Sequence, residues 1–366
     1  MPPPYPYDRL RELEPLAAAH DGGVVDLSIG TPCDPPPGFV LDALSASGTE
    51  RGYPASIGSP AFREAAAGWL DRRLGVTLGP DQLAACIGTK ELVAGLPHWL
   101  RLRDPSRDTV LYPAISYPSY AMGATLAGAR AVPVPPAADG SLDLGAVSED
   151  DAARALCLWV NVPGNPTGAV SDLGPVVAWG RARGVPVASD ECYVEFTWQG
   201  PRRTVLEHGT DGVLAVHSLS KRSNLAGVRA GFYAGDQALV HYLSEVRKHA
   251  GFMVPGPVQA AAVAAWGDDA HVDEQCERYL GRLDLLAQIL TDRDVPATRP
   301  DGAFYLWVAA PDGDAWALAR WLAEQGGALV SPGDFYGEHG AGFVRIAAVQ
   351  PDERLELVAR RLRGAG

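Results

Sequence analysis

The sequence of 366 residues contains very little lysine. Of its 31 basic residues, three are lysines (Lys90, Lys221 and Lys248) and all the others are arginines. An arginine side chain keeps its proton under physiological conditions, so it cannot serve as an amine nucleophile. Any chemistry that needs a free side-chain amine therefore depends on one of these three lysines.

Cysteines are also few, and their positions follow no metal-binding or disulfide pattern. The five residues Cys33, Cys86, Cys157, Cys192 and Cys276 include no CxxC pair. An odd, scattered set in a chain of this length is typical of reduced thiols in the cytoplasm, and it argues against a zinc site or a disulfide framework.

Long apolar runs and excess positive charge are absent as well. The sequence has no run of about 18 apolar residues that could span a bilayer, and its proline-rich start lacks the pattern of a secretory signal. Acidic residues outnumber basic ones by 44 to 31, which gives a net charge of −13. This negative charge argues against nucleic acid and anionic membranes as partners. At 47% hydrophobic and 20% charged residues, the chain is predicted to fold around a sizeable core.

Short apolar runs alternate with amphipathic helical segments between about residue 80 and residue 243. The runs have the character of strands buried on both faces and occupy residues 109–112, 155–161, 185–189, 213–218 and 230–234. Amphipathic segments such as 91–102 and 173–183 lie between them. This alternation predicts an α/β fold with a mostly parallel sheet covered by helices on both faces. Ligands bind beyond the carboxyl ends of such strands, so functional residues are expected there.

The pattern changes after Lys248. Helices are expected at residues 258–266, 273–290 and 314–325, and strands at 304–308, 328–331 and 343–347, which together predict a smaller α+β lobe. Gly and Pro residues make the segment 251–257 the expected hinge. The prediction is a large domain at residues 46–250, a small domain at 251–366, and an irregular N-terminal segment at 1–45 that packs on the small domain.

Lys221 is the lysine best placed for chemistry. It follows the expected strand 213–218 in the string HSLSKRSN, with Ser218 before it and Arg229 eight residues later. Cationic neighbours and partial burial would lower the pKa of the Lys221 amine, which is the condition for attack on a carbonyl. The serine hydroxyls and Arg229 would suit a phosphate group. A solvated lysine on a polar loop is the competing interpretation.

Two further strand ends carry polar groups. Asp190 and Tyr193, in SDECY, follow one strand, and a carboxylate there is costly unless it meets a positive partner such as a protonated ring nitrogen. Asn165, in the turn sequence NVPGNPTG, follows another strand and can donate from its amide. A cap for Asp190 and a simple turn for the Asn165 segment are the ordinary alternatives.

Three more strings complete the set of candidates. Gly88, Thr89 and Lys90 open the helical segment 91–102, and the free N–H groups of a first helical turn bind anions. Tyr117, in SYPSY, could stack on a flat ring, although core packing is commoner for such a residue. Arg345 is a charge inside an apolar strand and should bind a carboxylate.

Each feature alone also fits an ordinary structural role, but together they are the set of groups that pyridoxal 5'-phosphate needs. In order along the chain, GYP, GTKE, YPSY, NPTG, SDECY, SLSK with GVRAGF, and VRIA resemble the fold-type I, class I/II aminotransferases. The longer strings CIGTKELVAGLP, VHSLSKRSNLAGVRAGF and SPGDFYG are similar to those of actinobacterial N-succinyldiaminopimelate aminotransferases. The resemblance implies a large domain with a seven-stranded, mostly parallel sheet flanked by helices, plus a smaller α+β domain.

The resemblance also implies roles for the matching residues. Lys221 is similar to the family's Schiff-base lysine, Asp190 to the partner of the ring nitrogen, and Asn165 and Tyr193 to donors to the phenolic oxygen. The remaining matches are Tyr117 for stacking, Gly88, Thr89, Lys90, Ser218 and Arg229 for the phosphate, Arg345 for the substrate α-carboxylate, and Gly30 for closing over the substrate. Tyr53, in GYP, resembles a phosphate-contacting tyrosine from the second subunit of a homodimer.

The expected reaction is a ping-pong transamination between N-succinyl-LL-2,6-diaminopimelate and 2-oxoglutarate, in lysine biosynthesis. No motif identifies the residue that binds the distal carboxylate, although Arg247 and Lys248 are candidates. Other interpretations remain open: an aminotransferase of aspartate or alanine type, a β-eliminating lyase that uses the same cofactor, or a non-catalytic regulator. The regulator would need a DNA-binding segment, for which neither the length nor the charge leaves room. The expected partners are small amino and 2-oxo acids and a second copy of the chain.

Overall fold

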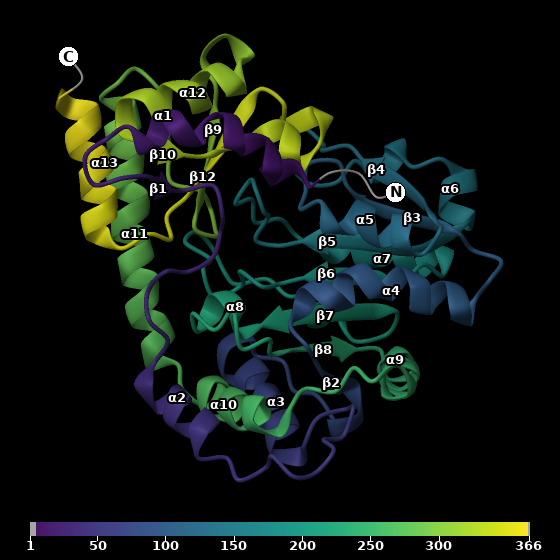
Figure 1. Ribbon diagram of the computed structural model, residues 1–366. Helices are drawn as coiled ribbons and strands as arrows, with labels where there is room; N and C mark the ends of the chain where they lie inside the picture. Colours follow the sequence, from purple (N-terminus) through teal and green to yellow (C-terminus); the bar gives the residue numbers. More distant parts are fainter. Residues whose placement is uncertain (1–4, 365–366) are drawn as a thin grey trace.

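The protein folds into two lobes, shown in Figure 1 for the computed structural model, which describes residues 5–364. One lobe holds a large sheet with helices on both sides, and the other holds two small sheets and the C-terminal helices. The long helix α11 (Ala270–Thr291) extends from the small lobe toward α2 and α10 (Figure 1).

The large sheet has seven strands in the order β2-β8-β7-β6-β5-β3-β4. The strands are β2 (Leu83–Cys86), β3 (Thr109–Pro113), β4 (Arg130–Val134), β5 (Ala155–Asn161), β6 (Val187–Asp190), β7 (Val213–Ser218) and β8 (Gly231–Gly235). Strands β4, β3, β5, β6 and β7 run parallel, whereas β8 is antiparallel to both of its neighbours. This confirms the predicted α/β fold with a mostly parallel sheet, and it brings the carboxyl ends of β5, β6 and β7 to one edge.

Helices cover both faces of the large sheet. One face packs against α4 (Thr89–Arg103), α5 (Ser119–Leu126) and α9 (Gln237–Ala250). The other face packs against α3 (Pro60–Leu74), α7 (Gly174–Arg183) and α10 (Gly256–Gly267). The apolar residues between these layers form the main core, and their removal from water is the dominant stabilising contribution.

The small lobe is built on an antiparallel sheet in the order β11-β12-β9. Its strands are β9 (Tyr305–Ala309), β11 (Ser331–Pro332) and β12 (Phe343–Ala347), and its helices are α11, α12 (Ala315–Gly326) and α13 (Asp352–Gly364). The N-terminal segment packs into the same core through Leu10, Leu13 and Leu27. It contains a 3-10 helix, η1 (Pro6–Glu12), the short helix α1 (Glu14–Ala18), and β1 (Val25–Asp26), which pairs with β10 (Ala328–Leu329).

Several expected elements differ in the structure. Strands β2 and β4 were not expected: β2 is short and rich in alanine, and β4 is an edge strand that carries Pro133 and exposed residues. Where a single strand was expected at 328–331, the structure has two short strands, one on each side of Val330. The first pairs with β1 and the second with β12. The N-terminal forty residues, expected to be irregular, include helices.

The buried cores divide the chain at a different place from the predicted domain limits. Val40 of α2 (Gly38–Ser45) and Trp266 of α10 lie in the core of the large sheet. Of the segment 251–257, expected as the hinge, residues 251–255 form a loop and the last two residues begin α10. The limits at residues 45 and 250 therefore stay a prediction. The packing of α10 on the large sheet favours a place after α10 where the chain crosses from the large lobe to the small lobe.

Two short helices complete the large lobe, α6 (Glu149–Ala153) beside the sheet and α8 (Leu219–Arg222) directly after β7. Among residues 5–364, no helix combines the length and the apolar character that a membrane-spanning segment requires.

Candidate active site

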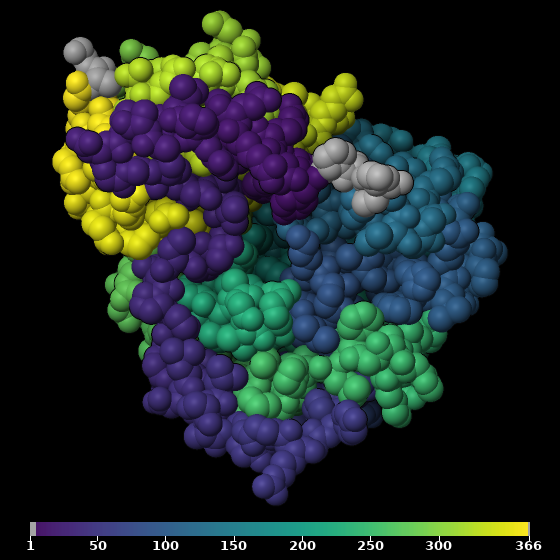
Figure 2. Space-filling model, viewed as in Figure 1, coloured from purple at the N-terminus to yellow at the C-terminus, as the bar shows by residue number. Residues whose placement is uncertain are grey.

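A cavity of about 500 Å³ lies at the carboxyl ends of β5, β6 and β7 and is lined by residues of both lobes. The N-terminal segment (purple in Figure 2) covers the small lobe and reaches the blue part of the large lobe, and its Tyr5 and Tyr7 also line the cavity. Eleven of the residues singled out in the sequence line this cavity: Gly30, Thr89, Lys90, Tyr117, Asn165, Asp190, Tyr193, Ser218, Lys221, Arg229 and Arg345.

Lys221 points its amine into the cavity from α8. The side chain of Ser218 caps this helix by accepting from Ser220 N at 3.1 Å. Lys221 Nζ contacts the carbonyl oxygen of Gly30, in the loop after β1. Burial lowers the pKa of Lys221 to about 8, and the positive charges of Arg345 and Arg229 act in the same direction. The amine therefore carries a free lone pair in a useful fraction of molecules near neutral pH.

Asp190 ends β6 on the same side of the sheet. Its Oδ2 accepts from the hydroxyl of Tyr120 at 3.0 Å, and its Oδ1 accepts from Cys192 N at 3.2 Å. Burial raises the pKa of Asp190, because the charged form is removed from water. A cationic group of a bound ligand would stabilise this carboxylate.

Arg345 is a buried charge whose acceptors among residues 5–364 are all neutral. It is 2% exposed. Nη1 donates to Asn165 Oδ1 at 2.8 Å, and Nη2 donates to the Tyr7 hydroxyl at 3.2 Å and to the Ser28 carbonyl. Nε has no hydrogen-bond partner in the described part of the chain. A buried guanidinium in this state can bind a ligand carboxylate.

Several tyrosines line the cavity. The hydroxyls of Tyr193 and Tyr305 lie 2.8 Å apart, and burial raises the pKa of Tyr305 to about 12, so it stays protonated. The Arg345 guanidinium lies 4.2 Å from the centre of the Tyr305 ring. Lys90 Nζ lies 5.4 Å from the ring centres of both Tyr5 and Tyr117.

An anion-binding cradle lies beside Lys221. Helix α4 begins at Thr89, and its N-cap, Gly88, provides no side-chain hydrogen bond, so the first N–H groups of the helix are available. Gly88 has φ +68°, and a Cβ added there would lie 2.3 Å from Arg229 Nη2. Glycine at position 88 is therefore what allows Arg229 to approach the helix start.

Other candidates lie elsewhere. Tyr53 is 98% exposed and does not line the cavity within this chain. Arg247, a candidate for the distal carboxylate, is buried in a two-point ion pair with Glu91, at 2.6 and 2.9 Å. Lys248 is exposed, 3.6 Å from Glu245. Neither one lines the cavity within this chain.

Sequence reasoning missed several side chains of the cavity, notably Tyr5, Tyr7, Tyr120, Cys192 and Tyr305. Tyr120 stands three positions after Tyr117, at the start of α5, and Cys192 stands between two residues that were predicted, so both had a local signal. Tyr305, Tyr5 and Tyr7 had no local sequence signal, because they reach the cavity from distant segments of the chain.

Comparison with known proteins identifies the family. A family model described as aminotransferase class I and II matches residues 22–362. The chain belongs to this family. Pyridoxal 5'-phosphate is the cofactor of these aminotransferases, and the family assignment confirms the resemblance seen in the sequence.

Among the relatives, the chain is 44% identical to OxyQ of Streptomyces rimosus, a 4-dedimethylamino-4-oxo-anhydrotetracycline transaminase, over 98% of this chain and 99% of that protein. It is 37% identical to the LL-diaminopimelate aminotransferase of Desulforudis audaxviator, over 99% of this chain and 95% of that protein. Among solved structures, an aminotransferase from Neisseria meningitidis has a TM-score of 0.90 at 32% identity, covering 99% of this chain and 97% of that one. A "probable N-succinyldiaminopimelate aminotransferase" from Thermus thermophilus has a TM-score of 0.87 at 33% identity, covering 98% of this chain and all of that one.

The cavity fits the aminotransferase cofactor. Asp190 offers a carboxylate for a protonated ring nitrogen, and Asn165 and Tyr193 offer donors for a ring oxygen. The first turn of α4 with Arg229 can hold a phosphate group, and Lys221 can offer an amine to the aldehyde. The unpartnered Nε of Arg345 is left for the substrate.

Proposed function

We propose that this aminotransferase transfers an amino group between N-succinyl-LL-2,6-diaminopimelate and 2-oxoglutarate. The observation that carries the proposal is that two of the basic side chains in the cavity remain for substrate carboxylates: the buried guanidinium of Arg345 and the amine of Lys90. Both substrates carry more than one carboxylate, so two separate cations suit them. The diaminopimelate aminotransferase among the relatives and the Thermus structure support the same substrate class.

The residues divide the work of transamination. Arg345 binds the substrate α-carboxylate through its guanidinium and thereby orients Cα toward Lys221. The Lys221 amine takes the proton from Cα, for which its lowered pKa is suited. Asp190 holds a proton on the cofactor ring nitrogen. When bound, the cofactor supplies the electron sink for the charge left on Cα.

Lys90, which the family resemblance places at the cofactor phosphate, is proposed instead as the partner of the distal carboxylate. It stands in the first turn of α4 and lines the cavity, and its Nζ lies 5.4 Å from the ring centres of Tyr5 and Tyr117. Such cation–π contacts are weak, so they leave the charge available to a ligand. Arg247, which the sequence offered for this role, is committed to Glu91.

We further propose that the protein acts as a cytoplasmic homodimer. The side chain of Tyr53 is 98% exposed, which suits a contact with the cavity of a second subunit. The five cysteines are free thiols, in keeping with a reducing compartment.

A second candidate is amination of a flat polycyclic ketone. OxyQ, at 44% identity over nearly the whole chain, is a transaminase of such a compound by its name. Tyr5, Tyr117 and Tyr305 give the cavity aromatic surface against which a flat ring could stack.

The test compares single half-reactions, read from the absorbance of the bound cofactor without coupling enzymes. The donors are N-succinyl-LL-diaminopimelate, LL-diaminopimelate, glutamate, aspartate and alanine, and pyruvate release from cysteine tests the lyase alternative. The proposal predicts the highest kcat/KM with N-succinyl-LL-diaminopimelate. The aminated form of the enzyme is then mixed with 2-oxoglutarate or with a flat polycyclic ketone, and the return of the original absorbance is followed. Turnover limited to aspartate or alanine, or a return of the absorbance with the polycyclic ketone only, would contradict the substrate assignment.

A further inference from the structure

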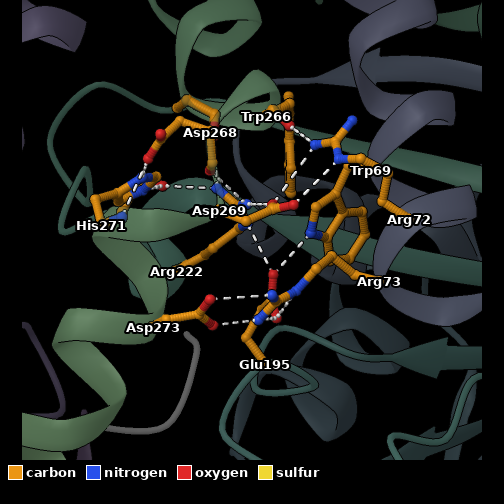
Figure 3. Close-up of polar contacts among 12 residues, drawn as sticks. Trp69, Arg72, Arg73, Glu195, Arg222, Trp266, Asp268, Asp269, His271 and Asp273 are labelled. Atoms are coloured by element: carbon orange, nitrogen blue, oxygen red, sulfur yellow. Dashed lines mark hydrogen bonds and ion pairs between the residues drawn. The ribbon is translucent and has the colours of Figure 1, made fainter.

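A cluster of charged side chains surrounds Arg222, the residue that follows Lys221 (Figure 3). Arg222 and Glu195 are 2% and 3% exposed, and Arg222 Nε donates to Glu195 Oε1 at 3.1 Å. The pair does not line the cavity.

Glu195 anchors one of the chain segments that form the cavity. Its Oε1 also accepts from Trp69 Nε1 at 2.7 Å, and its Oε2 accepts from Arg73 Nε at 3.0 Å. Glu195 stands two residues after Tyr193 and five after Asp190. Fixing this carboxylate against α3 therefore fixes the end of the segment that carries Asp190 and Tyr193.

Arg222 anchors the other segment, which carries Lys221, to the passage between the lobes. Its Nη1 donates to the carbonyl of Ala265 at 2.6 Å, and its Nη2 donates to Asp269 Oδ1 at 2.7 Å and to the Asp268 carbonyl at 2.9 Å. These acceptors lie where α10 ends and α11 begins (Figure 3).

Helix α8 needs such an anchor, since four residues are far too few to form a stable helix alone. A buried ion pair adds little net stability, because the cost of removing two charges from water offsets most of their attraction. Its value is geometric: the rigid fork of a guanidinium fixes the directions of several acceptors at once.

We propose that Arg222 and Glu195 are a positioning pair for transamination, fixing the segment that bears Lys221 against the segment that bears Asp190 and Tyr193. The pair touches neither substrate nor cofactor and acts through the backbone of the two segments. The inference rests on the proposed role of Lys221 and is independent of which amino donor the enzyme uses.

The test compares Arg222→Gln with Arg72→Gln. Arg72 belongs to the same cluster and donates to the Trp266 carbonyl at 2.7 Å and to Asp269 at 3.1 Å, but it touches neither of the two segments. Both substitutions remove one guanidinium from the cluster. Glu195→Gln and the double variant complete a double-mutant cycle. The double variant removes both charges of the pair, so neither one is left without the other.

The first readout is the pKa of Lys221 in the full chain prepared without cofactor. Trace acetylation over a range of pH, read lysine by lysine by mass spectrometry, suits a chain that has only three lysines. We expect Arg222→Gln to raise the pKa of Lys221 from about 8 toward its ordinary value of 10.5, as the amine gains access to water. The second readout is kcat of the holoenzyme, expected to fall about tenfold or more with KM within about threefold.

Arg72→Gln is expected to leave both readouts at their wild-type values, even where it lowers the unfolding temperature. Wild-type Lys221 reactivity and kcat in Arg222→Gln, or equal changes in both variants, would overturn the inference. If Arg222→Gln does not fold, Glu195→Gln and the double variant are judged by the same criteria. An ordinary pKa for Lys221 in the wild-type chain would instead contradict its proposed catalytic role.

Discussion

Arg345 Nη1 donates a hydrogen bond of 2.8 Å to Asn165 Oδ1, and this contact joins strand β12 of the small lobe to the loop that follows β5. The same guanidinium contacts Tyr7 from the N-terminal segment. Three distant parts of the chain thus converge on the group proposed to bind the substrate α-carboxylate, which makes that group sensitive to small changes of geometry.

Replacing Arg345 by Lys should lower kcat/KM about 10- to 100-fold, since lysine keeps the charge but loses the fork that binds a carboxylate at two points. The effect should appear for every amino donor, because all of them carry an α-carboxylate. Steady-state kinetics measures it. Arg299→Lys is the matched control, because Arg299 forms a forked pair with Asp284 at the surface, and its kinetics should not change.

Replacing Lys221 by Arg should lower kcat about 10²-fold or more, because a guanidinium does not form the covalent link or exchange the proton. Lys248→Arg, at an exposed lysine, should retain wild-type turnover. Single-turnover absorbance with saturating amino donor gives the rate for each of the two variants. Near-normal turnover of Lys221→Arg would remove this residue from the mechanism.

Uptake of pyridoxal phosphate by cofactor-free protein should depend on pH through Lys221. The folded-state pKa of about 8 lies below the ordinary value of 10.5, so the amine becomes reactive as pH rises through 8. As the pH is increased toward 8, the uptake rate should therefore rise about tenfold per pH unit, and it should level off above pH 8. Stopped-flow absorbance measures the rate, and a midpoint near 10.5 would contradict the lowered pKa.

Replacing Gly88 by Ala should weaken cofactor binding about tenfold or more, since the added Cβ would lie 2.3 Å from Arg229 Nη2 at a backbone φ of +68°. Equilibrium dialysis with pyridoxal phosphate gives the dissociation constant. At Gly281, exposed in the middle of α11 with nothing within 4 Å of an added Cβ, Ala should leave cofactor affinity unchanged. Gly281→Ala should also raise the free energy of unfolding by about 0.5–1 kcal/mol.

Replacing Lys90 by Gln should raise KM for N-succinyl-LL-diaminopimelate and for glutamate about tenfold, with a smaller effect on alanine, which has no distal carboxylate. Lys248→Gln removes a lysine charge away from the cavity and serves as the control. Equal loss for alanine and for the dicarboxylic donors would show that Lys90 does not recognise the distal group.

The sequence was sufficient for most of the sheet and for the residues at its carboxyl edge. Asp190, Asn165 and Lys221 follow strands whose apolar runs are easy to recognise, and parallel strands bring their carboxyl ends together. Local patterns therefore translate directly into a shared site. Strand β4 was missed because Pro133 and its exposed residues are atypical of a strand in a parallel sheet.

The contacts around Tyr193 and Arg345 could not be predicted in the same way. Tyr305 meets Tyr193 across 112 positions of sequence, and Tyr7 meets Arg345 across 338. No periodicity or motif encodes contacts between segments so far apart, since they depend on how the small lobe and the N-terminal segment pack. The ion pair of Arg247 could not be predicted for the same reason, because its partner, Glu91, lies 156 positions away.

Lys221 as the residue that binds pyridoxal phosphate is the central claim about this enzyme. Reduction of the holoenzyme with borohydride, followed by peptide mass spectrometry, tests this most directly, because the reagent makes the link permanent and only three lysines can carry it. We predict one pyridoxyl group per chain, on the peptide that contains Lys221. A label on Lys90 or Lys248, or no label at all, would contradict the claim.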